Sequence, residues 1–127
     1  MFYKVTCVLF CVLISSCILP PYHLTEVASV FVHNNTNQAF EFQSGLNSNW
    51  GERSTINVQD FESFRYEVFS KKEPFPDNLD SFKFYLPDCV VLMNRQHIDA
   101  YAKRPASGRL GWDIIVDASL IKSIGCE

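Results

Sequence analysis

The chain has 127 residues, 47% of them hydrophobic and 20% charged, which suits one globular domain rather than a disordered segment. Its formal net charge of −3 lacks the basic excess of a nucleic-acid-binding protein, so we expect no nucleic-acid partner. Aromatic residues make up 14% of the chain, and the 11 phenylalanines among them supply enough large rings to fill the core of a small domain.

Residues 1–16 are typical of a cleaved export signal. Lys4 supplies one positive charge, the stretch from Val5 to Ile14 is apolar except for Thr6, and two serines follow. A transmembrane helix needs about 20 apolar residues, and this stretch is about half that length. We therefore predict that residues 1–16 are a signal peptide rather than a permanent membrane span.

The end of this segment, Ile14-Ser15-Ser16-Cys17, resembles the lipobox of bacterial lipoproteins, with serine at two positions where alanine or glycine is common. The resemblance implies cleavage before Cys17, a diacylglycerol on its thiol and an acylated amine, and two or three acyl chains give stable membrane anchoring. It also implies a domain that faces the periplasm, and Ile18, which is not acidic, favours the inner leaflet of the outer membrane. An ordinary cleaved signal with an unmodified cysteine is the alternative.

The predicted mature chain has two parts. Residues 17–23 form a lipidated tether, because the proline pair Pro20-Pro21 favours an extended backbone. Residues 24–127 form the predicted periplasmic domain, in which the dominant hydrophobic period is two. The chain therefore predicts a β domain held close to a bilayer.

The first strands of this domain are predicted over residues 27–32 and 38–43. Asn34-Asn35-Thr36-Asn37 lies between them and is typical of a turn, so we expect a hairpin. The first three of these residues also form a glycosylation sequon, for which the turn is the preferred explanation.

Further strands are predicted over residues 55–59, 64–70, 82–86, 89–93 and 112–117, with loops over 44–54 and 71–80. Residues 95–104 have helical spacing and predict a short helix that Pro105 ends, whereas residues 118–124 are ambiguous. This pattern predicts a mainly β fold: a small antiparallel β-sandwich, Ig-like or transthyretin-like, with one short helix. A half-open barrel with a helix packed over it is the alternative.

Two cysteines are left once the signal is removed and Cys17 is acylated. Because the periplasm is oxidising, Cys89 and Cys126 predict a disulfide. Free or metal-binding thiols are the alternative, but no CxxC motif or histidine at ligand spacing accompanies them, so we predict no metal site.

Motifs of catalysis are missing from the sequence, which has no GxSxG, HExxH or phosphate-binding glycine pattern. We therefore predict neither an enzyme nor a cofactor. His97 and Asp99 lie close together on the predicted helix and are interpreted as part of its solvated face.

Residues that suit binding are scattered. Trp50 and Phe75 lie in predicted loops, where each ring either anchors a partner or folds back on the core. Four basic residues fall within a short stretch and either meet an acidic partner or stay solvated: Arg95, Lys103, Arg104 and Arg109.

The outline as a whole resembles the small periplasmic lipoproteins described as immunity proteins of type VI secretion systems. The shared features are the lipobox, the short Pro20-Pro21 tether, an early strand ending in Asn34-Asn35 and a small β domain with few cysteines. The resemblance implies a protein partner, a toxin that the chain would bind and block, and it transfers no functional residue. A structural or accessory lipoprotein of an envelope assembly is the alternative, and an enzyme of unrecognised type is the third hypothesis.

Overall fold

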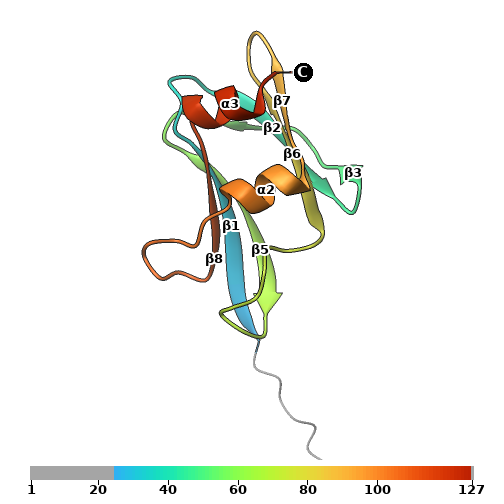
Figure 1. Cartoon of the computed structure of the whole chain (residues 1–127), viewed down its shortest axis with the longest axis vertical. Helices are drawn as coiled ribbons and strands as arrows, with labels where there is room; N and C mark the ends of the chain where they lie inside the picture. The colour runs from blue at the N-terminus through green and yellow to red at the C-terminus, as the bar shows by residue number, and fades with distance from the viewer. Residues whose placement is uncertain (1–24, 127) are drawn as a thin grey trace, which may run out of the picture.

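The structure is a computed structural model, which describes residues 25–126. Two β-sheets packed face to face form most of this part of the chain (Figure 1). Sheet A has the strand order β5–β1–β8, and sheet B has the order β3–β2–β6–β7, with β4 also paired to β2. The strands are β1 (Glu26–Asn34), β2 (Phe40–Leu46), β3 (Asn49–Trp50), β4 (Ser54–Ile56), β5 (Phe61–Val68), β6 (Leu79–Tyr85), β7 (Val90–Met93) and β8 (Gly111–Val116). The predicted mainly β sandwich is confirmed.

Sheet A is built around β1, whose alternate residues Ala28, Val30 and Val32 face the core. β1 pairs with β5 in antiparallel fashion, as expected, but it pairs with β8 in parallel. The parallel pair is a departure from the all-antiparallel sandwich that the sequence predicts. It brings the C-terminal part of the chain beside its first strand.

The predicted hairpin of residues 27–32 and 38–43 is wrong, because β1 and β2 lie in different sheets. The fully buried side chain of Asn34 explains the crossing: its amide donates to the carbonyl oxygens of Gln38 and Ile56, each at 2.9 Å. Its Oδ1 accepts the backbone N–H of Thr36, also at 2.9 Å. Residues 34–37 do form a turn, as predicted, but this turn carries the chain from sheet A to sheet B.

Residues 44–54, predicted as a loop, instead contain the end of β2 and the short strand β3. Asn47 and Ser48 have positive φ angles of 49° and 65°, and Leu46 pairs with Asn49 across them. Two successive left-handed residues give the twist of a two-residue hairpin. Trp50 therefore lies on an edge strand of sheet B.

Two short helices, α2 (Arg95–Tyr101) and α3 (Ala118–Ile124), close the side of the sandwich between the edges of β7 and β8 (Figure 1). Asn94 caps α2 by accepting from the backbone N–H of His97. The helix is shorter than the predicted 95–104. It ends at Tyr101, because the backbone of Ala102 is extended. The ambiguous residues 118–124 form α3, which Gly125 ends at a φ of 84°.

The core lies between the sheets and beneath the helices. It is made mostly of large apolar side chains, among them Phe40, Phe42, Phe82, Phe84, Val91, Met93, Ile98, Ile114, Val116 and Leu120. The disulfide Cys89–Cys126 is present, as predicted, and ties the end of the chain to the segment before β7.

The predicted signal peptide 1–16, the tether 17–23 and Cys17 lie outside the described residues. Within residues 25–126, neither helix is long and apolar enough to cross a membrane.

Candidate functional site

The arginines that the sequence suggests as partner contacts hold loops of the domain itself. Arg95 donates to the carbonyl oxygens of Phe75 at 3.0 Å and Pro76 at 2.8 Å, and it also pairs with Asp99 at 3.0 Å. Arg104 donates to the carbonyl oxygens of Glu73 and Gly111. These guanidinium groups therefore fix the long loop between β5 and β6 and the start of β8.

Phe75 folds onto the core, one of the two placements expected for it, since only 4% of its surface is exposed. Its ring lies 6.0 Å from that of Trp112, which in turn lies beneath the Arg104 guanidinium at 4.0 Å. Nearby, burial raises the pKa of the Tyr66 phenol, while the Arg104 charge opposes that rise. Phe75 and Arg104 thus meet at the half-buried Trp112, with Phe75 buried on one side of it and Arg104 exposed on the other.

The outer face of sheet A carries a group of side chains of which only Arg109 is among the binding residues predicted from the sequence. Three of them lie side by side across the strands: Phe61 of β5, His33 of β1 and Ile115 of β8. Phe61 is 48% exposed and Ile115 is 42% exposed. Together with their neighbours we call this group the sheet A cluster: Phe31, His33, Phe61, Arg109, Asp113 and Ile115.

Polar contacts hold the sheet A cluster in place. Arg109 donates to the carboxylate of Asp113 at 2.6 Å and to the carbonyl oxygen of Ser29 at 2.9 Å. Its guanidinium lies 4.0 Å from the ring centre of Phe31, and His33 Nε2 lies 3.2 Å from Asp113 Oδ1. Because these hydrogen bonds and the ring contact restrict the same side chain, Arg109 is held against Phe31 and Asp113 without a partner.

The outer face of sheet B offers a second candidate surface around Trp50, which is 41% exposed. The Lys83 amine lies 4.3 Å from the centre of the Trp50 ring, and the Arg53 guanidinium lies 3.8 Å from that of Tyr85. Each of these two rings has a cation over one side. Sheet A, in contrast, presents Phe61 and Ile115 on either side of His33, and the Phe31 ring lies 4.8 Å from that of Phe61.

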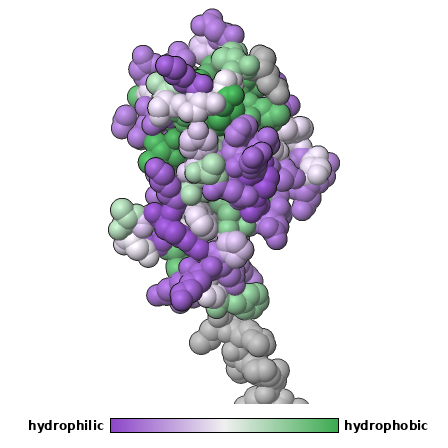
Figure 2. Space-filling view, in the orientation of Figure 1, coloured by the Kyte–Doolittle hydropathy of each residue, from purple (hydrophilic) through white to green (hydrophobic). Residues whose placement is uncertain are grey.

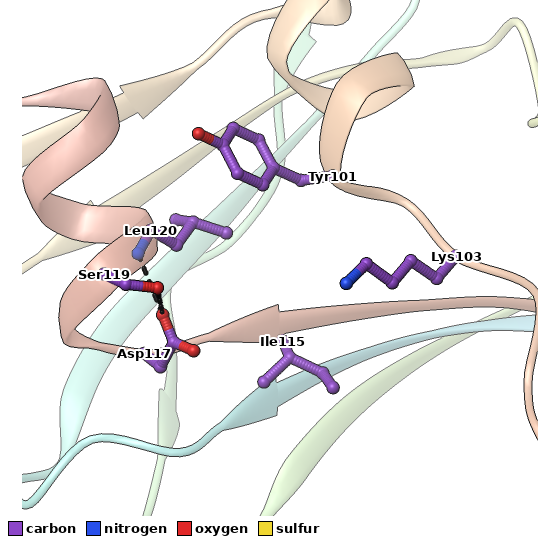
Figure 3. Close-up of a pocket in the computed structure, with 6 residues that line it drawn as sticks. All are labelled: Tyr101, Lys103, Ile115, Asp117, Ser119 and Leu120. Atoms are coloured by element: carbon purple, nitrogen blue, oxygen red, sulfur yellow. Dashed lines mark hydrogen bonds between the residues drawn. The ribbon is translucent and has the colours of Figure 1, made fainter.

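A small pocket of about 180 Å³ lies beside β8, between the end of α2 and the start of α3 (Figure 3). The Lys103 side chain runs toward it, with Tyr101 on one side and Ile115 on the other. Asp117 at its edge accepts hydrogen bonds from the Leu120 N–H and the Ser119 hydroxyl, each at 2.8 Å. These bonds lower the pKa of the Asp117 carboxyl, the backbone bond most, so this carboxylate acts as a helix cap.

The face that carries this pocket is mixed in character. Figure 2 shows hydrophilic residues over α2 and hydrophobic residues that reach the surface around α3. Within residues 25–126, no group of three or more His, Cys, Asp or Glu side chains is placed to hold a metal ion.

Comparison of the chain with protein-family models, with curated proteins and with solved structures gives no significant match.

The signal that could have found the sheet A cluster is strand alternation. Phe31 and His33 have the opposite parity to the buried Val30 and Val32, so they must face outward once β1 is a strand. Which strands flank β1 is not visible in that pattern. Phe61 and Ile115 come from distant parts of the chain, and only the sheet order brings them to His33.

Proposed function

We propose that this chain is a lipid-anchored periplasmic binding protein that blocks a toxin, and that the sheet A cluster is its contact with that protein. The observation that carries the proposal is the exposed row Phe61–His33–Ile115 beside the fixed Arg109–Asp113 pair. Aromatic rings and arginines are the side chains that most often dominate protein–protein binding energy. A cluster ordered in advance also loses little conformational entropy when a partner binds.

The position of the cluster suits a protein tethered through Cys17. β1 starts at Glu26, shortly after the predicted tether 17–23, and extends about 23 Å to His33 at about 3.3 Å per residue. The cluster therefore lies toward the end of the domain that is far from the attachment point. A partner that approaches from the periplasm would reach it without first meeting the bilayer.

Support for a toxin as the partner comes from the resemblance to type VI immunity lipoproteins, and support for the outer-membrane location comes from the lipobox and Ile18. Blocking a toxin requires only a rigid surface that fits over the toxin's active cleft. An accessory lipoprotein would instead bind a component of an envelope assembly. The gene beside this one distinguishes the two, since an immunity gene is expected next to that of its toxin.

Survival and binding can be measured in cells that export the product of the adjacent gene to the periplasm. We expect the full chain to restore growth, and Phe61→Ser combined with Ile115→Ser to abolish protection and weaken binding by about 30-fold or more, the scale of a two-kilocalorie hot spot. Trp50→Ser is the matched control, because it removes an equally exposed ring from sheet B.

Three outcomes would count against the proposal. Growth inhibition that the unmodified chain does not relieve contradicts toxin blocking. Full protection by the Phe61→Ser, Ile115→Ser variant contradicts the assignment to sheet A. Loss of protection in Trp50→Ser alone would move the contact to sheet B.

A further inference from the structure

The end of the domain that receives the tether carries an exposed aromatic ring and two lysines. Phe69 follows the last residue of β5, and its neighbour Val68 pairs with Glu26 at the start of β1. Phe69 is 72% exposed, the most exposed large apolar side chain of residues 25–126. Lys71 and Lys72 come next and are both exposed.

Hydrogen bonds give this turn a fixed shape. The Glu73 carboxylate accepts the backbone N–H of Phe69 at 2.7 Å and that of Ser70 at 3.2 Å. The Lys72 N–H donates to the Ser70 hydroxyl at 3.3 Å. Glu73 is thus directed to the backbone, and within residues 25–126 neither Lys71 nor Lys72 forms an ion pair.

Two other acidic residues lie near this end, Glu26 and Glu67, and both are exposed on the paired strands β1 and β5. Glu67 precedes the turn on β5, and Glu26 lies opposite the end of β5 on β1. Phe69 and the two lysines are on the turn itself. The part of this end that projects beyond the strands therefore carries the exposed Phe69 ring and a net positive charge, from two lysines against the one carboxylate of Glu73.

The length of the tether keeps this turn near lipid. Eight residues, 18–25, separate Cys17 from β1. Fully extended they span at most about 28 Å, at about 3.5 Å per residue. An acylated Cys17 would therefore keep the start of β1, and the turn beside it, within about 30 Å of the bilayer surface.

We propose that the turn of Phe69, Lys71 and Lys72 is a second membrane contact, which binds an anionic lipid surface; this rests on the proposed anchoring of Cys17. The Phe69 ring enters the interfacial region, where aromatic side chains are favoured, and the two ammonium groups lie over lipid phosphates. The contact orients the domain with its tether end on the bilayer and presents the sheet A cluster to the periplasm.

A lipid-restricted quencher can test this contact. The acylated mature protein is isolated from producing cells and reconstituted into vesicles of phosphatidylcholine alone or with 30% phosphatidylglycerol. A fluorophore is attached through Ser70→Cys, beside Phe69, or through Ser63→Cys, an exposed serine in the middle of β5. Both cysteines of the disulfide are oxidised and Cys17 is acylated, so the introduced thiol is the reactive one.

We expect quenching of the label at residue 70 by the lipid-bound quencher in anionic vesicles and little quenching at residue 63. Lys71→Ala and Lys72→Ala should each reduce the fraction of protein in the quenched state by a factor of up to about five, the effect of one basic residue near an anionic surface. Phe69→Ser should reduce it in both kinds of vesicle. Lys122→Ala is the matched control, because it removes an exposed lysine from α3 at the other end of the domain.

Flotation of the same vesicles separates the two proposals. Protein that floats while the labels at residues 70 and 63 are quenched equally, or not at all, overturns the second contact and leaves the anchor intact. Protein that stays in the aqueous fraction overturns the anchor and the contact with it. Equal effects of Lys71→Ala and Lys122→Ala would overturn the assignment of the contact to this turn.

Discussion

Single side chains decide how this chain crosses between its sheets, and Asn34 is the clearest example. Its amide is fully buried and makes four hydrogen bonds, two given to carbonyl oxygens and two received from Thr36. A buried carbonyl that loses its donor retains the full cost of its desolvation. The sequon to which Asn34 belongs is therefore explained by folding, since a glycan would replace one of the two N–H donors of this nitrogen and has no room at a side chain that is fully buried.

Replacing Asn34 should accordingly destabilise the fold. We expect Asn34→Ala to lower the free energy of unfolding by about 3 kcal/mol, because several buried backbone groups lose their partner at once. Asn37→Ala, in the exposed part of the same turn, should change it by less than about 0.5 kcal/mol. Urea unfolding followed by tryptophan fluorescence measures both, and equal effects would contradict the role of Asn34.

The parallel pairing of β1 with β8 depends on a glycine. Gly111 has a φ of 120°, and a Cβ at this position would lie 1.9 Å from the carbonyl oxygen of Ser29 on β1. The strands could not stay paired there with any larger residue. Gly108 has a φ of 76°, but a Cβ there would meet no atom within 4 Å, so it shares the left-handed conformation without the close approach.

This pair of glycines gives a matched test. Gly111→Ala should lower the free energy of unfolding by more than about 3 kcal/mol, whereas Gly108→Ala should cost only about 1 kcal/mol, the penalty of the left-handed backbone. Thermal unfolding of the two variants distinguishes them. Similar melting temperatures would show that β8 does not approach β1 as closely as the structure indicates.

At the scale of elements, the helix α3 depends on Asp117, whose carboxylate caps its first turn. Folding lowers the pKa of this carboxyl. The ionised group therefore stabilises the folded chain above the ordinary pKa of aspartate, and this contribution is lost as the pH falls through the lower folded-state pKa.

We expect Asp117→Ala to reduce the free energy of unfolding by about 1 kcal/mol at neutral pH, the usual value of a helix cap. The difference from the unmodified protein should shrink as the pH falls below about 4, where the carboxyl becomes protonated. Asp88→Ala, an exposed aspartate outside the helices, serves as the control and should have little effect at either pH. A difference that does not depend on pH would contradict the capping role.

Local patterns in the sequence predicted most elements but not their neighbours. Alternation marks β1, β5, β6 and β8, and spacing marks α2, because burial of one face is a local property of strand and helix geometry. The hairpin prediction failed because Asn34-Asn35-Thr36-Asn37 looks the same whether the turn stays in one sheet or crosses to another. Only the partner of the Asn34 amide, the carbonyl of the distant Ile56, decides between them.

The same limit applies to the candidate site. Arg95, Arg104 and Arg109 stood equally in the basic group, and all three donate to backbone carbonyls. Only Arg109 also lies over the Phe31 ring on the outer face of sheet A. Phe75 and Trp50 looked alike as loop aromatics, yet one is buried and one is exposed. Whether a ring or a guanidinium faces solvent depends on how the loops pack, and the order of residues along a loop does not predict that packing.

For the molecule as a whole, the disulfide between Cys89 and Cys126 joins the C-terminus to the segment before β7, across a sequence separation of 37. A loop of that size restrains the unfolded chain by about 3–4 kcal/mol on the loop-entropy model. It also ties down the segment that follows α3, the helix whose Leu120 is buried in the core.

Loss of this bond should therefore weaken the whole domain. We expect the double variant Cys89→Ser, Cys126→Ser to lose about 3–4 kcal/mol of its free energy of unfolding, and reduction of the unmodified protein to have the same effect. Reductant should leave the double variant unchanged. Unfolding curves that coincide for oxidised and reduced protein would contradict a structural role.

The proposed lipid contact requires the chain to be anchored through Cys17, and the proposed toxin contact relies on the same anchor for its location in the periplasm. Metabolic labelling with palmitate, followed by membrane fractionation, tests this most directly by comparing the unmodified chain with Cys17→Ser. We predict label and membrane association for the unmodified chain and the loss of both in the variant. Equal labelling and fractionation of the two proteins would contradict the account.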